Sequence, residues 1–344
     1  MCLYPTLIKN TKYTKTKKNG GIIPAVRDKR VLGVPIGCGR CMECMKKKKR
    51  DWQIRLLEDI KTNKNGIFVT LTFSNESIVK LKRKVQKKHG KGLEAYELDN
   101  QIATLAARLF NERWRKTNKK AIRHWLVTEL GHNGTENIHM HGIVWTNKPI
   151  QEIKEKWSYG YVYPNSTYEV QENFVNEKTV NYITKYISKQ DLKHKEYKPI
   201  VLTSSGIGKN YTNRLDAQKN KYKPLETNAT YKTNTGHKMA LPIYYRNKIY
   251  TDEERELLWI EMLNKNKRYI CGEEIDISKG VDVSRKQVEN YAQDIANRLH
   301  LGEKGLDIQE QKLIIDCITG LLNIAVQGGL TPMGKVGSIV KGGK

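Results

Sequence analysis

Two histidines separated by one residue, His139 and His141, stand just before the apolar run Ile143-Val144-Trp145. In a β-strand alternate side chains point to the same face, so both imidazoles project together while Met140 faces the core. Neighbouring imidazoles on a rigid strand are suited to binding a metal ion. The alternative interpretation is a partly buried strand that carries two unconnected histidines.

A carboxylate on the preceding segment can complete this metal site. Residues 123–130 (RHWLVTEL) have the β-branched and aromatic content of a strand, and the polar residues 131–137 predict the turn of a hairpin. Glu129 then lies on a strand adjacent to the histidines, where its carboxylate gives a three-ligand site with positions open for substrate oxygens. His132 and Glu136 are closer in sequence, but they lie in the turn and are weaker candidates.

A second group of reactive side chains follows in residues 179–190, which predict a helix. Tyrosines and lysines alternate on one face of that helix at positions i, i+3, i+4 and i+7, namely Tyr182, Lys185, Tyr186 and Lys189. A phenol with a pKa of about 10 is a poor nucleophile at neutral pH. Neighbouring ammonium groups favour the phenolate, and a metal-held phosphate is a better electrophile. The pattern favours DNA cleavage through a covalent phosphotyrosine, and the alternative is an amphipathic helix with a Tyr/Lys surface stripe.

A third group consists of cysteines near the N-terminus. Cys38, Cys41 and Cys44 are spaced three apart and stand before a basic segment that continues as a predicted helix. Such spacing lets thiolates converge on one ion, and Cys2 is the candidate fourth ligand of a structural Zn²⁺ site. An iron–sulfur cluster, or reduced cysteines beside a phosphate-binding helix, are the alternatives.

The composition narrows the class of protein. The 344 residues carry a formal net charge of +26, which solubility does not require and a polyanionic partner explains. No apolar run approaches the roughly 18 residues of a spanning helix, and no amphipathic anchor, lipidation signal or signal peptide is present, so no membrane partner is expected. Six cysteines without an export signal favour reduced thiols or a metal over disulfides. These features predict an intracellular protein that handles DNA or RNA.

Several segments predict the elements that position these residues. Residues 67–73 (IFVTLTF) indicate a further strand, and residues 98–116 carry the apolar stripe of a core helix. Residues 52–60 continue the cysteine segment as a helix, whereas residues 80–92 are predicted to be an exposed basic connector. The tyrosine-rich residues 157–163 predict one more strand.

Taken in order, the Thr-rich strand Phe68–Phe73, the His139-Met140-His141 triplet and the Tyr182–Lys189 helix resemble the three motifs of HUH endonucleases that initiate rolling-circle replication. In particular, the chain is similar to the replication initiator proteins of microviruses, the small single-stranded DNA phages, and most of all to their gokushovirus branch. The similarity covers about residues 1–265 and includes Met1-Cys2 with Pro5, Val34-Pro35, the cysteine segment from Cys38 to Cys44, Trp52 with Arg55-Leu56, Gly206-Ile207-Gly208 and residues 241–255 (LPIYYRNKIYTDEER). One departure is Ile36, which stands where related proteins run from proline directly into Cys-Gly.

The resemblance implies an α+β HUH endonuclease fold, with a central antiparallel five-stranded sheet flanked by helices. It implies that His139 and His141 bind Mg²⁺ or Mn²⁺ on the sheet, with Glu129 as the best match for the acidic third ligand. The tyrosine helix would lie over that metal. Tyr182 and Tyr186 would then cleave alternately, one starting a round of replication and the other resolving it.

Four regions follow from this interpretation. Residues 1–60 are the cysteine-containing basic segment and its helix, residues 61–215 the HUH endonuclease domain, and residues 216–265 a family-like extension. Residues 266–344 are predicted to be a helical appendage with a loose tail, because residues 284–299 and 307–326 show helical apolar periodicity.

The expected function is that of a phage replication initiator in the host bacterial cytoplasm. It would nick the origin through a 5′-phosphotyrosine, leave a 3′-hydroxyl for the host polymerase and later rejoin the strand. Lys185 and Lys189 would contact phosphate or the tyrosine oxygen. The expected partners are single-stranded DNA, replicative-form double-stranded DNA at the origin, and the host replication helicase and polymerase. The alternatives are an HUH transposase or relaxase-like nickase, and a non-enzymatic zinc-containing nucleic-acid-binding protein.

Overall fold

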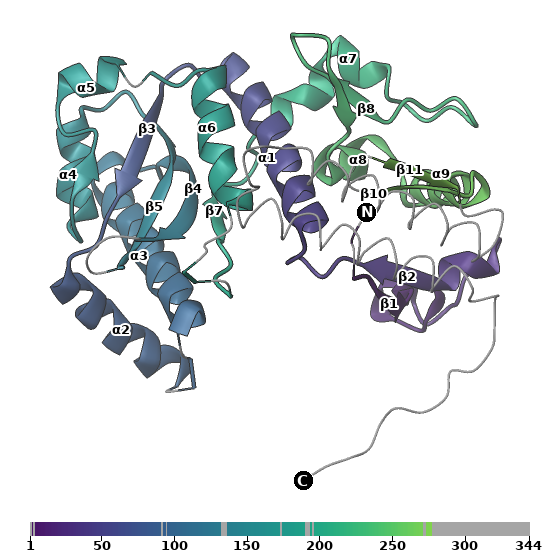
Figure 1. Ribbon diagram of the computed structural model, residues 1–344, viewed down its shortest axis with the longest axis horizontal. Coiled ribbons are helices and arrows are strands. Elements are labelled where there is room, and N and C mark those ends of the chain that lie inside the picture. The colour runs from purple at the N-terminus through teal and green to yellow at the C-terminus, as the bar shows by residue number, and fades with distance from the viewer. Residues whose placement is uncertain are drawn as a thin grey trace, which may run out of the picture. The chain divides into compact units, whose positions relative to one another are not determined.

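The computed structural model describes residues 2–276 except residues 3, 91, 94, 132–135, 173, 190–192, 195 and 271–272. The chain forms two compact units (Figure 1). The sheet unit comprises residues 48–221 and 228–249, and the cysteine unit comprises residues 1–47, 222–227 and the chain from residue 250 onward. The four regions expected from the sequence stay a prediction. The two C-terminal helices expected at residues 284–299 and 307–326 lie outside the described residues.

The sheet unit is built around a five-stranded antiparallel sheet in the order β6-β3-β5-β4-β7. Its strands are β3 (Gly66–Leu71), β4 (Arg123–Leu130), β5 (Ile138–Trp145), β6 (Val162–Tyr163) and β7 (Val201–Thr203). Strands β4 and β5 form the hairpin that the sequence predicted, and β3 pairs with the other side of β5. The predicted α+β class, with a five-stranded antiparallel sheet flanked by helices, is confirmed.

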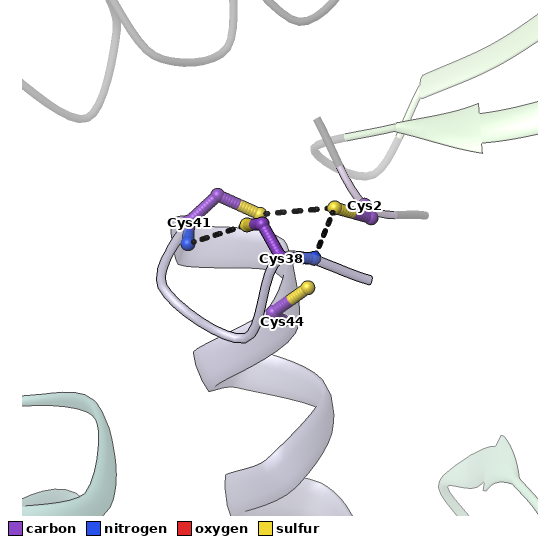
Figure 2. Close-up of side chains that lie close together, drawn as sticks. All are labelled: Cys2, Cys38, Cys41 and Cys44. Carbon is purple, nitrogen blue, oxygen red and sulfur yellow. Dashed lines mark hydrogen bonds between the residues drawn. The ribbon is translucent and has the colours of Figure 1, made fainter. Parts of the chain in front are cut away.

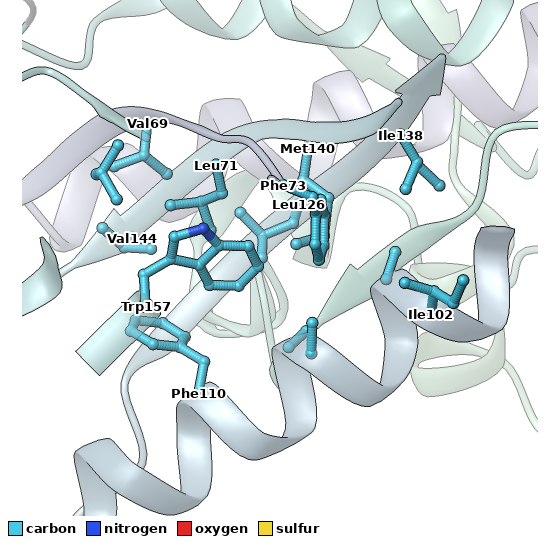
Figure 3. Packing of buried hydrophobic residues seen from close by; sticks show 14 of the residues in the cluster. Val69, Leu71, Phe73, Ile102, Phe110, Leu126, Ile138, Met140, Val144 and Trp157 are labelled. Carbon is cyan, nitrogen blue, oxygen red and sulfur yellow. The ribbon is translucent and has the colours of Figure 1, made fainter. Parts of the chain in front are cut away.

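One face of the sheet is covered by α2 (Asn75–His89), α3 (Ala95–Asn118) and α4 (Ile150–Trp157). The even-numbered residues of β5, among them Ile138, Met140 and Val144, point into this core (Figure 3). They pack there with Phe110 of α3 and Trp157 of α4, both of which are fully buried. This apolar layer fixes which face of β5 remains for its odd-numbered histidines.

The opposite face is covered by the apolar residues of two other helices, α1 (Met42–Thr62) and α6 (Glu177–Ser188). Leu56, Leu57 and Ile60 of α1 pack here with Trp125 of β4 and Ile143 of β5. Both layers are dry and closely packed, so the polar residues at one end of β4 and β5 are held on a rigid support.

Helix α6 follows from its sequence. Asn176 caps its first turn in a reciprocal capping box with Thr179, and Glu177 suits the positive end of the helix dipole. The buried face consists of residues at helical spacing, Val180, Ile183, Thr184 and Ile187. The helix begins two residues before the predicted range 179–190 and ends at Ser188, where Lys189 is already extended.

The remaining elements are short. In the sheet unit they are α5 (Thr167–Glu172), the 3₁₀ turn Lys209–Asn213, α7 (Leu215–Gln218), β8 (Thr230–Lys232), β9 (Lys238–Ala240) and α8 (Ile243–Ile249). In the cysteine unit they are β1 (Thr6–Lys9), three 3₁₀ turns (Thr11–Tyr13, Lys17–Asn19 and Lys29–Leu32), β2 (Gly33–Ile36), α9 (Asp252–Asn264), β10 (Lys267–Ile270) and β11 (Glu273–Asp276). None of the helices in the described ranges has the length and apolar character needed to cross a bilayer.

Two expectations about local structure were wrong. The connector predicted at residues 80–92 is mostly α2, a helix capped by Ser74 that buries only Leu81 and Val85 against the core. The strand predicted at residues 157–163 is reduced to Val162–Tyr163, because α4 continues to Trp157 and the chain then turns at Ser158 with a φ of +47°.

Candidate active site

Three potential metal ligands meet on the face of the sheet that carries α6. Glu129 of β4 lies directly opposite His139 of β5, and His141 follows on the same face of β5. The Nε2 atoms of His139 and His141 lie 3.2 and 3.0 Å from the same oxygen, Oε2 of Glu129. The three ligand atoms all lie within 4.8 Å of one another. The expected histidine pair and the carboxylate across the hairpin are therefore brought together.

Neighbouring groups orient each imidazole. Nδ1 of His141 lies 2.9 Å from the hydroxyl of Thr70, which is the register partner of His141 on β3. Nδ1 of His139 lies 3.4 Å from the carbonyl oxygen of Asn137. A ring that donates its Nδ1 proton to such an acceptor presents the lone pair of Nε2 to Glu129, as metal-binding histidines do.

The charge states also suit a cation. Burial acts to raise the pKa of Glu129, but hydrogen bonds from His139, His141 and Lys189 hold that pKa well below its usual range. Burial lowers the pKa of His141, and this outweighs its hydrogen bond to the carboxylate. At neutral pH the site therefore presents an ionised carboxylate beside a neutral imidazole, which are the forms that ligate a metal.

The donor set limits the choice of ion. Two imidazole nitrogens and one carboxylate oxygen, with 12–19% of each side chain exposed, fit a divalent cation that accepts both nitrogen and oxygen ligands. Mn²⁺ matches this mixture better than Mg²⁺, which prefers oxygen ligands alone. The second carboxylate oxygen, Oε1 of Glu129, is 2.5 Å from Nζ of Lys189.

The tyrosines of α6 lie directly beside these ligands. The ring of Tyr186 stacks on that of His141, with 4.3 Å between ring centroids and 16° between planes. The hydroxyls of Tyr182 and Tyr186 are 2.6 Å apart and hydrogen-bonded. Tyr182 is 50% exposed and contacts Phe68 of β3 edge-on. Both phenols are thus near the candidate metal, and one of them is open to an incoming strand.

Tyr186 is not ionised by its surroundings. Burial raises its pKa, and the hydrogen bond and charge of Tyr182 and the charge of Glu129 raise it further. Lys189 lies 5.7 Å from the centre of the Tyr186 ring, which is within reach of a cation–π contact. Activation of a phenol here therefore requires a bound cation or the substrate itself.

The structure separates the two lysines that the sequence grouped together. Lys189 reaches Glu129, whereas Lys185 is exposed, and none of the side-chain hydrogen bonds or ion pairs of the described residues involves it. Sequence reasoning also missed Thr70 and Asn137 as the partners of the histidines. Thr70 belongs to the predicted Thr-rich strand, but its pairing with His141 depends on a register that joins distant parts of the chain.

The four candidate zinc ligands also come together, in the cysteine unit. The sulfur atoms of Cys2, Cys38, Cys41 and Cys44 all lie within 4.8 Å of one another (Figure 2). None of the four forms a disulfide. The structure therefore contains two separate groups of side chains that could each hold a metal ion.

Comparison with known families adds an independent finding. Residues 66–191 match the model of a replication-associated protein family, the ORF2 family. The matched range begins at β3 and ends just after α6, so it contains Thr70, Glu129, both histidines and both tyrosines. Comparisons with curated proteins and with solved structures give no match. The family match supports a role in DNA replication as a rolling-circle replication initiator.

Proposed function

We propose that this protein is an HUH-type DNA endonuclease and strand transferase that nicks a replication origin through a 5′-phosphotyrosine intermediate. The observation that carries this proposal is the juxtaposition of a Glu129/His139/His141 ligand triad with two hydrogen-bonded tyrosines, one of which stacks on His141. The family match over the same residues supports it.

Each group has a chemical part to play. A divalent cation such as Mn²⁺ or Mg²⁺, held by Glu129, His139 and His141, would withdraw negative charge from the scissile phosphate and orient it for in-line attack. Thr70 and the Asn137 carbonyl hold the histidine rings in place. The rigid strands keep these groups in position without reorganisation during the reaction.

The reaction conserves the energy of the phosphodiester. The phenolic oxygen of Tyr182 or Tyr186 forms a bond to phosphorus, and the bond from phosphorus to the 3′-oxygen breaks. The phenol loses its proton to solvent, and the departing 3′-oxygen gains one to become a hydroxyl. Attack of a 3′-hydroxyl on the phosphotyrosine reverses these steps, rejoins DNA and frees the tyrosine.

The lysines of α6 and its C-terminal end would act on the phosphate. Nζ of Lys189 already lies beside the triad, where it would offset charge on the phosphate or on the attacking oxygen. Lys185 is exposed, so its contribution is a contact with the DNA backbone. With two tyrosines on one helix, one phenol would hold the 5′ end while the other makes the next cut.

The surface charge supports DNA as the partner. The net charge is +26, and α2 alone exposes six cationic side chains, Lys80, Lys82, Arg83, Lys84, Lys87 and Lys88. Helix α1 adds the exposed Lys46, Lys47 and Arg50. Such residues bind phosphates in a salt-dependent manner and hold the origin without reading its sequence.

The biological setting belongs to the same proposal. Similarity to gokushovirus initiators supports a phage origin as the substrate, on replicative-form duplex and on displaced single strands in the host bacterial cytoplasm. The host helicase and polymerase would use the exposed 3′-hydroxyl.

Covalent capture tests the proposal. Single-stranded oligonucleotides tiled across the genome that encodes the chain are incubated with the full-length protein and Mn²⁺, and adducts are resolved on denaturing gels. We expect an adduct on the 5′ side of one site and a free 3′-hydroxyl on the other fragment. DNA binding without any adduct would favour the non-enzymatic nucleic-acid-binding alternative, and cleavage only at a transposon end or transfer origin would favour a transposase or relaxase.

Variants identify the nucleophile. Changing both Tyr182 and Tyr186 to Phe should abolish the adduct while DNA binding persists. Tyr168→Phe, at another exposed tyrosine on α5, is the matched control and should form the adduct at the wild-type level. An adduct that survives in the double variant would show that another residue attacks the phosphate.

A further inference from the structure

The fold of the cysteine unit brings together four cysteines that are far apart in sequence. Strands β1 and β2 are antiparallel, with Thr6 opposite Ile36. The chain preceding β1 and the chain following β2 therefore leave the hairpin side by side, which places Cys2 next to Cys38. Cys44, in the first turn of α1, lies three residues after Cys41, so their side chains fall on neighbouring positions.

The distances between the sulfur atoms suit a single ion. Sγ of Cys2 is 3.9 Å from Sγ of Cys41, and all four sulfur atoms lie within 4.8 Å of one another. Tetrahedral zinc with bonds of about 2.3 Å separates its thiolate sulfurs by about 3.8 Å. An iron–sulfur cluster is larger than one ion and holds its cysteines farther apart.

Backbone amides surround the sulfurs as they do in zinc-binding loops. Sγ of Cys38 accepts hydrogen bonds from the amides of Arg40 and Cys41, at 3.4 and 3.2 Å. Sγ of Cys2 accepts from the amides of Tyr4 and Cys38, at 3.3 and 3.2 Å. Donors aimed at sulfur favour the thiolate, which is the form that binds metal. The N-terminus of α1 adds its positive dipole end beside Cys41 and Cys44.

Two glycines make the close approach feasible. A Cβ on Gly37 would lie 3.0 Å from Sγ of Cys44 and 3.7 Å from Cβ of Cys2, so a side chain there would displace the thiols. Gly39 has a φ of +69°, which lets the loop between Cys38 and Cys41 turn back on itself. Ile36, the residue that departs from the family pattern, is absorbed in β2 as the exposed partner of Thr6.

We propose that Cys2, Cys38, Cys41 and Cys44 bind one Zn²⁺ in a closed, structural site. Four protein thiolates complete the tetrahedral coordination and leave no position for water or substrate. The ion would tie the residue that precedes β1, the loop that follows β2 and the first turn of α1 to one another. It is separate from the cation of the Glu129 site in ligand type and in ion preference, since thiolates select zinc and the His/carboxylate set favours Mn²⁺.

Metal analysis of the full-length chain tests the site. Protein purified under reducing, anaerobic conditions is passed over a metal-free column and analysed for zinc and iron by mass spectrometry. We expect one zinc per chain, and the same value in the His139→Ala/His141→Ala variant, which lacks the other site. X-ray absorption at the zinc edge should show four sulfur neighbours at about 2.3 Å. Replacement by Co²⁺ should give the intense visible bands of tetrahedral thiolate cobalt.

A variant pair completes the test. Cys44→Ser should lose the zinc, whereas Cys271→Ser, at a cysteine outside the described residues, should retain it. Since Cys44→Ser can fail to fold, the absorption spectrum of the wild-type chain decides independently of any variant. The proposal is overturned by iron with inorganic sulfide in place of zinc, by nitrogen or oxygen neighbours at the zinc edge, or by zinc that disappears in the double histidine variant.

Discussion

Thr70 offers a sharp test of the metal site, because it is not a ligand. Its hydroxyl lies 2.9 Å from Nδ1 of His141, on a side chain that is only 12% exposed. Thr70→Val keeps the shape and the β-branching of the residue but removes the hydroxyl. Nδ1 of His141 then loses this partner, and the ring is free to turn its Nε2 away from Glu129.

The size of the effect follows from that geometry. Loss of a partner that orients a metal-binding histidine lowers metal affinity by roughly 10–100-fold. Such a change corresponds to about 1.4–2.7 kcal/mol of binding free energy. Among the described residues, the Thr70 hydroxyl bonds to His141 and the two tyrosine hydroxyls bond to each other, so the cleavage rate at saturating metal should stay within a few-fold of wild type.

The assay is Mn²⁺ titration by calorimetry, together with the yield of covalent adduct as a function of Mn²⁺ concentration. Thr70→Val should shift both midpoints upward by the same factor, and Thr70→Ser, which restores the hydroxyl, should return them toward wild type. Thr72→Val is the matched control, because its hydroxyl bonds to the backbone of Tyr161 and to no ligand. Unchanged midpoints in Thr70→Val, or an equal shift in Thr72→Val, would refute the role assigned to Thr70.

Three further predictions concern packing, pH and metal. Ile183→Ala should lower the free energy of unfolding by about 2–5 kcal/mol in urea titrations, because Ile183 is fully buried beneath α6; a loss below about 1 kcal/mol would contradict that packing. Burial acts to raise the pKa of Glu58, but hydrogen bonds from Lys61, Tyr231 and Arg214 hold it below 4.5, so its contribution to stability is present above about pH 4.5 and is lost as the pH falls through the folded-state pKa. Glu58→Gln should therefore be less stable than wild type at pH 7, with a difference that shrinks in acid, and a constant difference would contradict this. Treatment with EDTA should stop adduct formation reversibly, with Mn²⁺ restoring it while the zinc content stays unchanged; adduct formation that persists in EDTA would argue against a cation at Glu129.

The sequence predicted the parts of the site that depend on local pattern. Alternation along β5 places His139 and His141 on one face, and a hairpin of the predicted length brings Glu129 onto the adjacent strand. The spacing of apolar residues in α6 likewise separates a buried face from the face with Tyr182 and Tyr186. Each of these inferences needs only the geometry of one element or of two consecutive strands.

Other features required knowledge of contacts between distant segments. Helix α2 carries so few apolar residues that its pattern resembles an exposed connector, and its stability comes from packing Leu81 and Val85 against the rest of the core. The tendency of tyrosine and valine to form strands was overridden at residues 157–161, where the carbonyl of Thr72 approaches Gly160 too closely for any side chain; a Cβ there would lie 2.5 Å away.

The pairing of β3 with β5 shows why such contacts matter for function. Residues 72–137 separate the two strands along the chain, so no local pattern specifies which residue of β3 faces His141. The register is fixed instead by the apolar alternation of both strands against one core, with Val69 and Leu71 buried on the same side as Met140. A slip of one residue would expose this apolar set and place Val69 or Leu71 opposite His141 in place of Thr70. The burial that stabilises the sheet therefore also selects the group that orients the metal ligand, and the chemistry of the site depends on the hydrophobic core beneath it.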